Sequence, residues 1–311
     1  MIQSEYKAID AFHYSGLKMF AKCPRLYYET YITKTNVQEA KDYFLYGNVV
    51  DTLITQPEEL NNRFVQVSRR SDGSTLDLEM KCTELRAEMD TVLIKAKEGN
   101  KVAIKGFESR QKKLIEMEEQ IRVAKESGDK VQVPTAIWND AHETATAIIN
   151  LPLHNELLTQ GYECRPQETL QSKGSVNRKG MIDRLYVKER DVIIVDIKTA
   201  YRLTDIDPLM YAGQLAYYKH IAEGNNFNVI SCYALVGDKG DQKLAQDYIY
   251  STEVLETAFN EVLKVETYLL EAISKNEWPS AKSIRGKEQE CFSCAECSNR
   301  PFSMGDNAVT V

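Results

Sequence analysis

Residues 180–199 read GMIDRLYVKERDVIIVDIKT. Two apolar runs, MIDRLYV and DVIIVDIK, flank the charged turn KERD, and this pattern predicts a β-hairpin. Each run holds one carboxylate among apolar neighbours, Asp183 in the first and Asp196 in the second. Lys198 follows two residues after Asp196, so strand alternation places both side chains on the same face. The stretch therefore predicts two neighbouring strands that bring two acidic groups and a lysine together.

Charged groups inside an apolar hairpin need a compensating partner, because burying an unpaired charge is costly. Two aspartates, the carbonyl of Ile197 and several waters would suit Mg²⁺, which prefers oxygen ligands and keeps part of its hydration shell. A metal in such a site can polarise a phosphoryl oxygen and lower the pKa of bound water. The pattern thus indicates metal-dependent phosphodiester hydrolysis. A surface hairpin with an ordinary ion pair would show the same local pattern.

The spacing D-x12-D-I-K resembles that of the PD-(D/E)XK nucleases, in the branch that holds RecB, AddB and RecE-type exonucleases. The resemblance implies an α/β fold with the core order αβββαβ, a mixed central sheet flanked by helices. It also implies that Asp183, Asp196 and the Ile197 carbonyl bind Mg²⁺ or Mn²⁺. Lys198 would then orient the attacking water or stabilise negative charge on the phosphate.

Three further positions fit this branch. The segment YAGQLAYYKHI places Gln214 and Tyr218 one helical turn apart on one face, which matches a Q-x-x-x-Y motif near the nuclease site. YGNVVDTLI matches a G-x-x-x-H motif except that Asp51 stands where the histidine would be, and aspartate also suits hard cations. Glu168 in PQETLQ matches a glutamate that in several relatives contacts the metal or its water. Asp51 could equally be a carboxylate on a helix surface.

The cysteines suggest a second metal centre. ECFSCAECSNRP carries Cys291, Cys294 and Cys297 in C-x2-C-x2-C spacing, which chance rarely produces. AKCPRLYY supplies Cys23 and resembles an element of AddB and of the CRISPR-associated spacer-processing nucleases. In those relatives one N-terminal and three C-terminal cysteines hold a four-iron iron–sulfur cluster that joins the chain ends. The last two cysteines are closer here than in relatives, so a Zn²⁺ site and free thiols stay open.

The elements group into four predicted regions. Residues 1–70 form N-terminal helices joined to the core, including one begun by Ser15 with a break at Pro24. Residues 71–133 are charged and form a helical-hairpin insertion. Residues 134–280 form the nuclease core, and the Cys-rich tail of 281–311 packs back on the N-terminus.

Bulk properties restrict the location and the partners. The formal net charge of −7 argues against coating of DNA by the whole surface. Basic residues near the predicted site could still meet phosphates, among them Arg178, Lys179 and Arg184. No stretch approaches the roughly 20 apolar residues of a membrane span. The first residues lack the apolar core of a signal peptide, so a cytoplasmic location is expected.

The resemblance implies a metal-dependent DNA exonuclease of recombination or repair, encoded by a phage or mobile element. No G-x-x-x-x-G-K-[ST] motif is present, so unwinding would need a helicase partner. A single-strand annealing protein and a ring-like homo-oligomer are the other expected partners. The first alternative is an iron–sulfur nuclease like AddB or the CRISPR spacer processors. The second is a DNA-binding module that kept the fold without catalysis.

Overall fold

The computed structural model describes residues 3–36, 42–67, 75–97, 100–128, 130–240 and 243–284, together with Cys291, Cys294 and Cys297. The chain divides into two compact units, which we describe separately. One unit combines residues 1–41 with 147–311, and the other covers residues 42–146. The predicted regions 1–70, 71–133, 134–280 and 281–311 divide the chain by element type, and they stay a prediction. Within the described residues, no helix is both long enough and apolar enough to cross a membrane.

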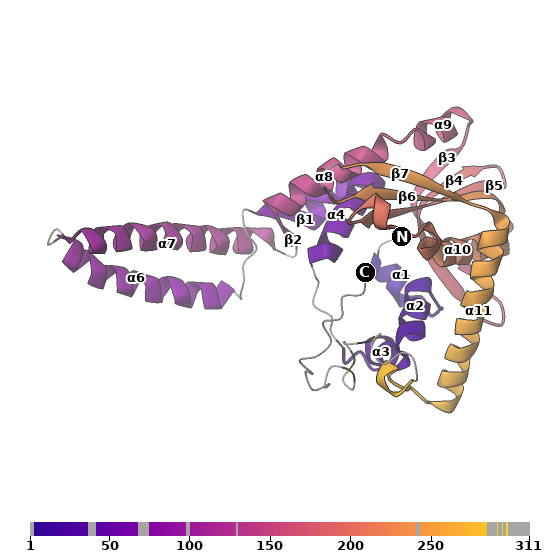
Figure 1. The fold of residues 1–311 in the computed structure, drawn as a ribbon, viewed down its shortest axis with the longest axis horizontal. Helices are drawn as coiled ribbons and strands as arrows, with labels where there is room; N and C mark the ends of the chain where they lie inside the picture. The colour runs from indigo at the N-terminus through magenta and orange to yellow at the C-terminus, as the bar shows by residue number, and fades with distance from the viewer. Residues whose placement is uncertain are drawn as a thin grey trace. The chain divides into compact units, whose positions relative to one another are not determined.

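A five-stranded mixed sheet forms the centre of the first unit (Figure 1). Its strands lie in chain order, with antiparallel pairs on both sides of the single parallel pair β5–β6. The mixed sheet and its flanking helices confirm the predicted α/β fold class. The strands are β3 (Glu163–Ser172), β4 (Arg178–Lys188), β5 (Asp191–Ala200), β6 (Asn228–Asp238) and β7 (Ala245–Tyr250).

The predicted hairpin is β4–β5. Lys188 pairs with Asp191 across a two-residue turn, and Glu189 takes a positive φ of 58° there. A parallel pair needs a crossover, and α10 (Ala212–Gly224) supplies it between β5 and β6. Two short 3₁₀ turns, Leu203–Asp205 and Pro208–Tyr211, lead into this helix. Asp207 begins the second turn by accepting a hydrogen bond from the Leu209 amide.

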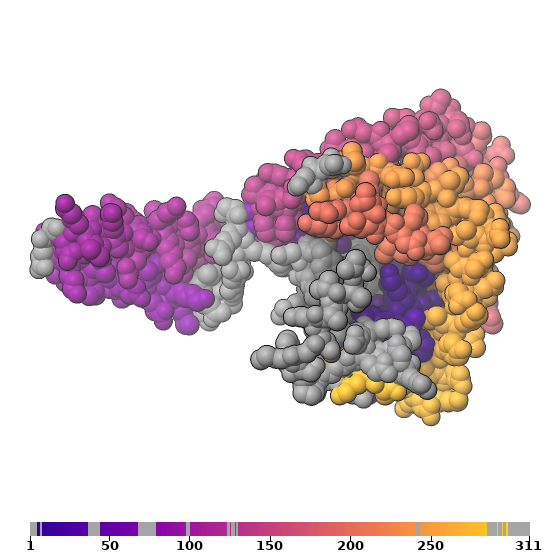
Figure 2. All heavy atoms as spheres, in the orientation of Figure 1, coloured from indigo at the N-terminus to yellow at the C-terminus, as the bar shows by residue number. Residues whose placement is uncertain are grey.

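The main core lies between the sheet and the helices α2, α10 and α11. Leu185 and Val187 of β4 contribute to this core. Tyr186 between them points to the opposite face of the sheet. There its hydroxyl is hydrogen-bonded to Nδ1 of His154 in α9 (Leu153–Thr159), at 2.6 Å. Figure 2 shows the indigo N-terminal segment lying against the orange α11. The other helices of this unit are α1 (Gln3–Ala8), α2 (Tyr14–Lys22), α3 (Pro24–Tyr27), α9 (Leu153–Thr159) and α11 (Thr252–Lys275).

The N-terminal helices begin and break at defined residues. The cap of α2 is His13 and not Ser15, because its imidazole Nδ1 accepts the Gly16 amide at 3.2 Å. The predicted break at Pro24 is present: Cys23 takes an extended backbone and α3 starts with Pro24 as its first residue. Phe12 forms an isolated parallel β-bridge with Arg178, so the segment before α2 lies beside the start of β4.

The second unit is built around a helical hairpin, α6 (Thr75–Lys97) and α7 (Lys101–Ser127) (Figure 1). Its small core contains Cys82, Leu85, Met89 and Met117. Two short parallel strands, β1 (Phe64–Val67) and β2 (Val131–Pro134), pair at the base of the hairpin. The unit also contains α4 (Asp42–Thr55), α5 (Leu60–Arg63) and most of α8 (Thr135–Ile149).

Candidate nuclease site

The first acidic residue lies where the hairpin opens. Pairing of β4 with β5 runs from Lys188↔Asp191 to Arg184↔Val195. One residue beyond the last pair, Oδ2 of Asp183 accepts the backbone N–H of Ile197 at 2.7 Å. At this point a side-chain carboxylate, and not a backbone carbonyl of β4, accepts the hydrogen bond from β5. This hydrogen bond fixes the Asp183 carboxylate beside β5.

Asp196 and Lys198 come together as strand alternation predicts. The Asp196 side chain is fully buried, and the Lys198 ammonium contacts its Oδ2 at 2.5 Å. This contact lies outside hydrogen-bond geometry, so Oδ2 accepts no regular hydrogen bond from the described residues. The Lys198 ammonium also donates to the carbonyl of Ile197 at 3.3 Å. One carboxylate oxygen and one carbonyl thus meet at the Lys198 ammonium, and the Asp183 carboxylate is bound to the next backbone amide of β5.

Gln214 closes the site from α10. Its side-chain amide donates to Oδ1 of Asp196 at 3.1 Å and to the hydroxyl of Tyr218 at 2.8 Å. Burial raises the pKa of Tyr218 well above its usual value, and the charges of Asp196 and Asp183 add to the shift. Tyr218 therefore stays a neutral phenol. Its ring fits only because residue 180 is glycine, since a Cβ there would lie 2.8 Å from Cδ1 of the ring.

Two further tyrosines lie near the same carboxylate. Burial raises the pKa of Tyr14, and the charge of Asp196 raises it further. Burial also raises the pKa of Tyr211, where Lys198 and Asp196 act in opposite directions. The Tyr14 hydroxyl reaches α10 at Gly213, where a Cβ would lie 2.5 Å from it. Neither residue could be predicted from sequence, because Tyr14 is distant from the hairpin along the chain and Tyr211 precedes the Q-x-x-x-Y motif.

The donor set fits a divalent cation. The buried Oδ2 of Asp196 is paired with the Lys198 ammonium, Asp183 uses one oxygen on the Ile197 amide, and the Ile197 carbonyl accepts from the same ammonium. Oxygen ligands of this kind suit Mg²⁺ or Mn²⁺. Asp183, Asp196 and Ile197 are therefore the residues that could hold the ion.

The two remaining predicted ligands stay predictions. Glu168 lies on β3 opposite Ile182, one position from Asp183, and its charge contributes to raising the pKa of Arg165. Gln167 before it has a positive φ of 50°, which interrupts regular strand alternation. Asp51 lies on α4 in the unit of residues 42–146, where its carbonyl accepts the Thr55 hydroxyl at 2.8 Å.

The four cysteines form a separate cluster. Their sulfur atoms all lie within 4.8 Å of one another, and each residue is at most 1% exposed. The Cys23 sulfur accepts the Ala281 amide and the Cys294 sulfur accepts the Cys297 amide, both at 3.3 Å. Burial raises the pKa of Cys23 and of Cys294, so without a cation these thiols stay protonated. Such a buried thiol group is suited to a metal centre. The cluster consists of Cys23, Cys291, Cys294 and Cys297.

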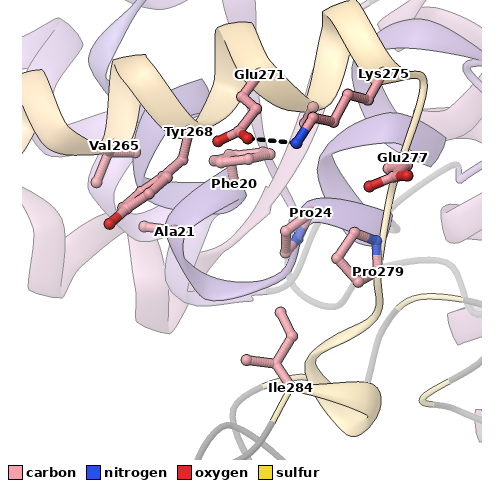
Figure 3. Close-up of a pocket in the computed structure, with 11 residues that line it drawn as sticks. Phe20, Ala21, Pro24, Val265, Tyr268, Glu271, Lys275, Glu277, Pro279 and Ile284 are labelled. Atoms are coloured by element: carbon pink, nitrogen blue, oxygen red, sulfur yellow. Dashed lines mark hydrogen bonds and ion pairs between the residues drawn. The ribbon is translucent and has the colours of Figure 1, made fainter.

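Figure 3 shows a pocket lined by residues of α2, α3, α11 and the segment that follows α11. Pro24 of α3 and Pro279 of the C-terminal segment line one groove, and Arg25 donates its amide to the Pro279 carbonyl at 3.1 Å. Lys275 and Glu271 of α11 form an ion pair at its edge. The cysteines therefore join two segments that already pack together.

Two basic residues near the site are bound to protein groups. The guanidinium of Arg178 pairs with both carboxylate oxygens of Glu266, at 2.8 and 2.6 Å, and the Glu266 side chain is only 3% exposed. The Lys179 ammonium donates to the carbonyls of Tyr6 and Ile9, at 3.0 and 2.7 Å. Arg184 is also buried. Arg178 and Lys179 are thus held by protein partners, and contact of these three residues with phosphates stays a prediction.

Comparison with known proteins agrees with this geometry. A family model of the PD-(D/E)XK nuclease superfamily matches residues 11–301. The chain belongs to the PD-(D/E)XK nuclease superfamily. The match spans the hairpin, the Gln214 helix and all four cysteines of the cluster, which confirms the family predicted from D-x12-D-I-K.

Two solved structures match this superfamily member in a structural comparison. One is a "Putative exonuclease" from Eubacterium rectale, at 15% identity and a TM-score of 0.58, with 99% of this chain and 96% of that chain covered. It supports the fold. The other is SSO0001, at 14% identity and a TM-score of 0.29, with coverages of 85% and 97%. No curated protein matches the chain.

Proposed function

We propose that this superfamily member is a metal-dependent DNA exonuclease of recombination or repair. The convergence of Asp183, Asp196 and Lys198 beside Gln214 carries the proposal, because two carboxylates fixed on neighbouring strands supply oxygen ligands for a divalent cation and a lysine lies beside them. The E. rectale protein of the same fold is named an exonuclease, which favours end-directed cutting. A phage or mobile-element origin is part of the proposal.

Each residue has a defined task in this mechanism. Asp183, Asp196 and the Ile197 carbonyl would hold Mg²⁺ or Mn²⁺, which when bound supplies Lewis-acid activation of the phosphate and its water. Lys198, whose side chain is 25% exposed, reaches from the buried carboxylate toward solvent. Its ammonium can position the attacking water and stabilise negative charge on the phosphate. Gln214 keeps the Asp196 carboxylate in one orientation, and Tyr218 holds the Gln214 amide.

The cysteine cluster would bind a metal centre that joins the chain ends. C-x2-C-x2-C is the spacing by which ferredoxin-type proteins bind four-iron clusters, which favours iron–sulfur and the alternative of an AddB-like or CRISPR spacer-processing nuclease. Zn²⁺ with four bonds of about 2.3 Å would set sulfurs about 3.8 Å apart. The Cys23 and Cys294 sulfurs lie 3.8 Å apart, so Zn²⁺ is the second candidate.

Digestion of end-labelled linear DNA and of closed circular DNA, each with and without Mg²⁺, tests the proposed activity. We expect loss of label from linear DNA only, and only with the metal. Cutting of the circle would show an endonuclease. Absence of any cutting with Mg²⁺ or Mn²⁺ would favour a non-catalytic DNA-binding protein.

A further inference from the structure

A large cavity lies beside the candidate nuclease site, within the unit of residues 1–41 and 147–311. Its volume is about 830 Å³, and its walls come from the N-terminal segment before and after α2, from β4 and from α11. The site residues Asp183, Asp196, Lys198 and Gln214 are not among those that line it. A cavity of this size is in the range of small-ligand sites, and it exceeds the volume of a single nucleobase.

Aromatic rings with polar edges line this cavity. Tyr6, Tyr27 and Tyr31 lie on its wall, and among the described residues no hydrogen-bond partner is found for their hydroxyls. His13 meets the Tyr31 ring edge-on, with ring centroids 5.0 Å apart. Because its Nδ1 accepts the Gly16 amide, the neutral His13 ring carries its proton on Nε2. The Lys179 ammonium lies 4.8 Å from the centre of the Tyr6 ring, and Tyr27 stacks on Trp278, so each of these two rings already uses one face. The cavity thus offers the remaining ring faces, above all that of Tyr31, together with hydrogen-bond donors and acceptors.

The charges of the cavity favour bases over phosphates. Lys179 lines it, but the Lys179 ammonium is already bound to two carbonyls. Asp10 also lies on the wall, and its carboxylate would repel a phosphate. Lys34 is exposed at the margin. A ligand with a neutral, flat, polar-edged body and a negative backbone outside the cavity would satisfy these groups.

Two segments of the chain connect the lining of the cavity with the site. Met181 lines it, and Asp183 lies two residues further along β4, about 6.6 Å at ordinary strand rise. His13 lines it as well, and the next residue, Tyr14, is the one whose pKa is raised by Asp196. A strand whose phosphate lies at Asp183 and Asp196 could therefore place its neighbouring bases in the cavity.

We propose that this cavity binds unpaired bases of the DNA strand that is being cut. The inference rests on the proposed nuclease function and adds its substrate class, a strand with a single-stranded or frayed end. Stacking on tyrosine tolerates any base, so the cavity would select for the unpaired state and not for a sequence. A fully paired end would have to open before it was cut.

Binding of labelled single-stranded and blunt duplex DNA, with Ca²⁺ in place of Mg²⁺ to prevent cutting, tests the inference. We expect Tyr31→Ala to weaken single-strand binding about tenfold and to leave duplex binding nearly unchanged. Tyr268→Ala removes a tyrosine of α11 that is 62% exposed and outside the cavity, and should change neither. Equal effects on both substrates, or none, would overturn the inference.

Photocrosslinking gives a readout that does not depend on the stability of a variant. A single strand carrying 5-iododeoxyuridine should crosslink the wild-type protein at Tyr6, His13, Tyr27 or Tyr31, as mapped by mass spectrometry. Crosslinks confined to other segments would overturn the inference. The underlying nuclease proposal is judged separately by Asp196→Asn. If Asp196→Asn loses cutting while Tyr31→Ala keeps single-strand binding, the nuclease proposal stands. The inference that the cavity binds unpaired bases is then overturned.

Discussion

The side-chain amide of Gln214 donates to Oδ1 of Asp196 at 3.1 Å, while its other hydrogen bond goes to the Tyr218 hydroxyl at 2.8 Å. The two donor positions of one amide group are thus used to hold a buried carboxylate against a buried phenol. This leaves Oδ2 of Asp196 facing Lys198. Gln214 is therefore a positioning residue that orients a metal ligand without contacting the phosphate.

Removing this amide should weaken metal use more than folding. We expect Gln214→Ala to lower the rate of DNA digestion by about 10- to 100-fold, as loss of a partner behind a metal ligand typically does. The Mg²⁺ concentration for half-maximal rate should rise. Gln111→Ala, at an exposed position on α7, is the control. An unchanged Mg²⁺ dependence in Gln214→Ala would contradict the positioning role.

The ion pair between Arg178 and Glu266 should matter for stability. Arg178→Ala would leave the Glu266 carboxylate buried without its partner, and such a loss typically costs about 3 kcal/mol or more. The free energy of unfolding, measured by urea denaturation, should fall accordingly. Arg122→Ala breaks the exposed pair with Glu119 and should change little. A similar, small effect of both variants would mean that Arg178 is not a structural residue.

His13 should make stability depend on pH. Burial, followed by the charge of Lys179, lowers the pKa of His13 to about 4, whereas the unfolded chain protonates it near 6.5. Between these values the unfolded state binds more protons, so the free energy of unfolding should fall as the pH drops from 6.5 to 4. The loss of unfolding free energy due to His13 is on the order of 2 kcal/mol. This is less than the free energy that corresponds to the whole pKa shift, because the ring is only partly buried.

The variant His13→Asn isolates this contribution, because asparagine keeps a cap acceptor for α2 but does not titrate. Unfolding curves of both proteins at several pH values give the difference directly. The stability of the wild type relative to His13→Asn should fall as the pH drops from 6.5 to 4. Parallel pH profiles would show that His13 is not held neutral in the folded protein.

The cysteine cluster predicts a bound metal whose loss destabilises the joined chain ends. Cys294→Ser should abolish metal binding and lower the melting temperature, whereas Cys164→Ser, outside the cluster, should do neither. Elemental analysis after anaerobic purification identifies the metal. Iron would come with a brown colour and absorbance near about 400 nm, and zinc would be colourless. Wild-type protein with neither metal would contradict the centre.

Local pattern was sufficient to predict the hairpin and its helix. Asp183, Asp196 and Lys198 could be placed because strand alternation and a two-residue turn act over a few residues. Gln214 and Tyr218 share a helix face for the same reason. Only the chemistry of the residue types was then needed to suggest a metal.

Long-range packing was beyond the same reasoning. Nothing in the sequence around Phe12 indicates that it forms a β-bridge with Arg178. In the fold, the N-terminal segment binds the Lys179 ammonium through the Tyr6 carbonyl. The same segment carries Tyr14, which lies near Asp196. A basic residue looks the same in sequence whether it meets a phosphate or a buried glutamate. Its role depends on a partner 88 positions away in the case of Arg178 and Glu266.

The most direct test of the central claim is the rate of label release from linear DNA as Mg²⁺ is titrated, for the wild type and for Asp196→Asn. The substitution keeps the shape of the side chain but removes the charge that would hold the ion. We predict a Mg²⁺-dependent rate in the wild type and a rate at least about a hundredfold lower in the variant. The control Asp247→Asn, at an exposed position of β7, should keep the wild-type rate. An Asp196→Asn enzyme that digests DNA at the wild-type rate and with the same Mg²⁺ dependence would contradict the account.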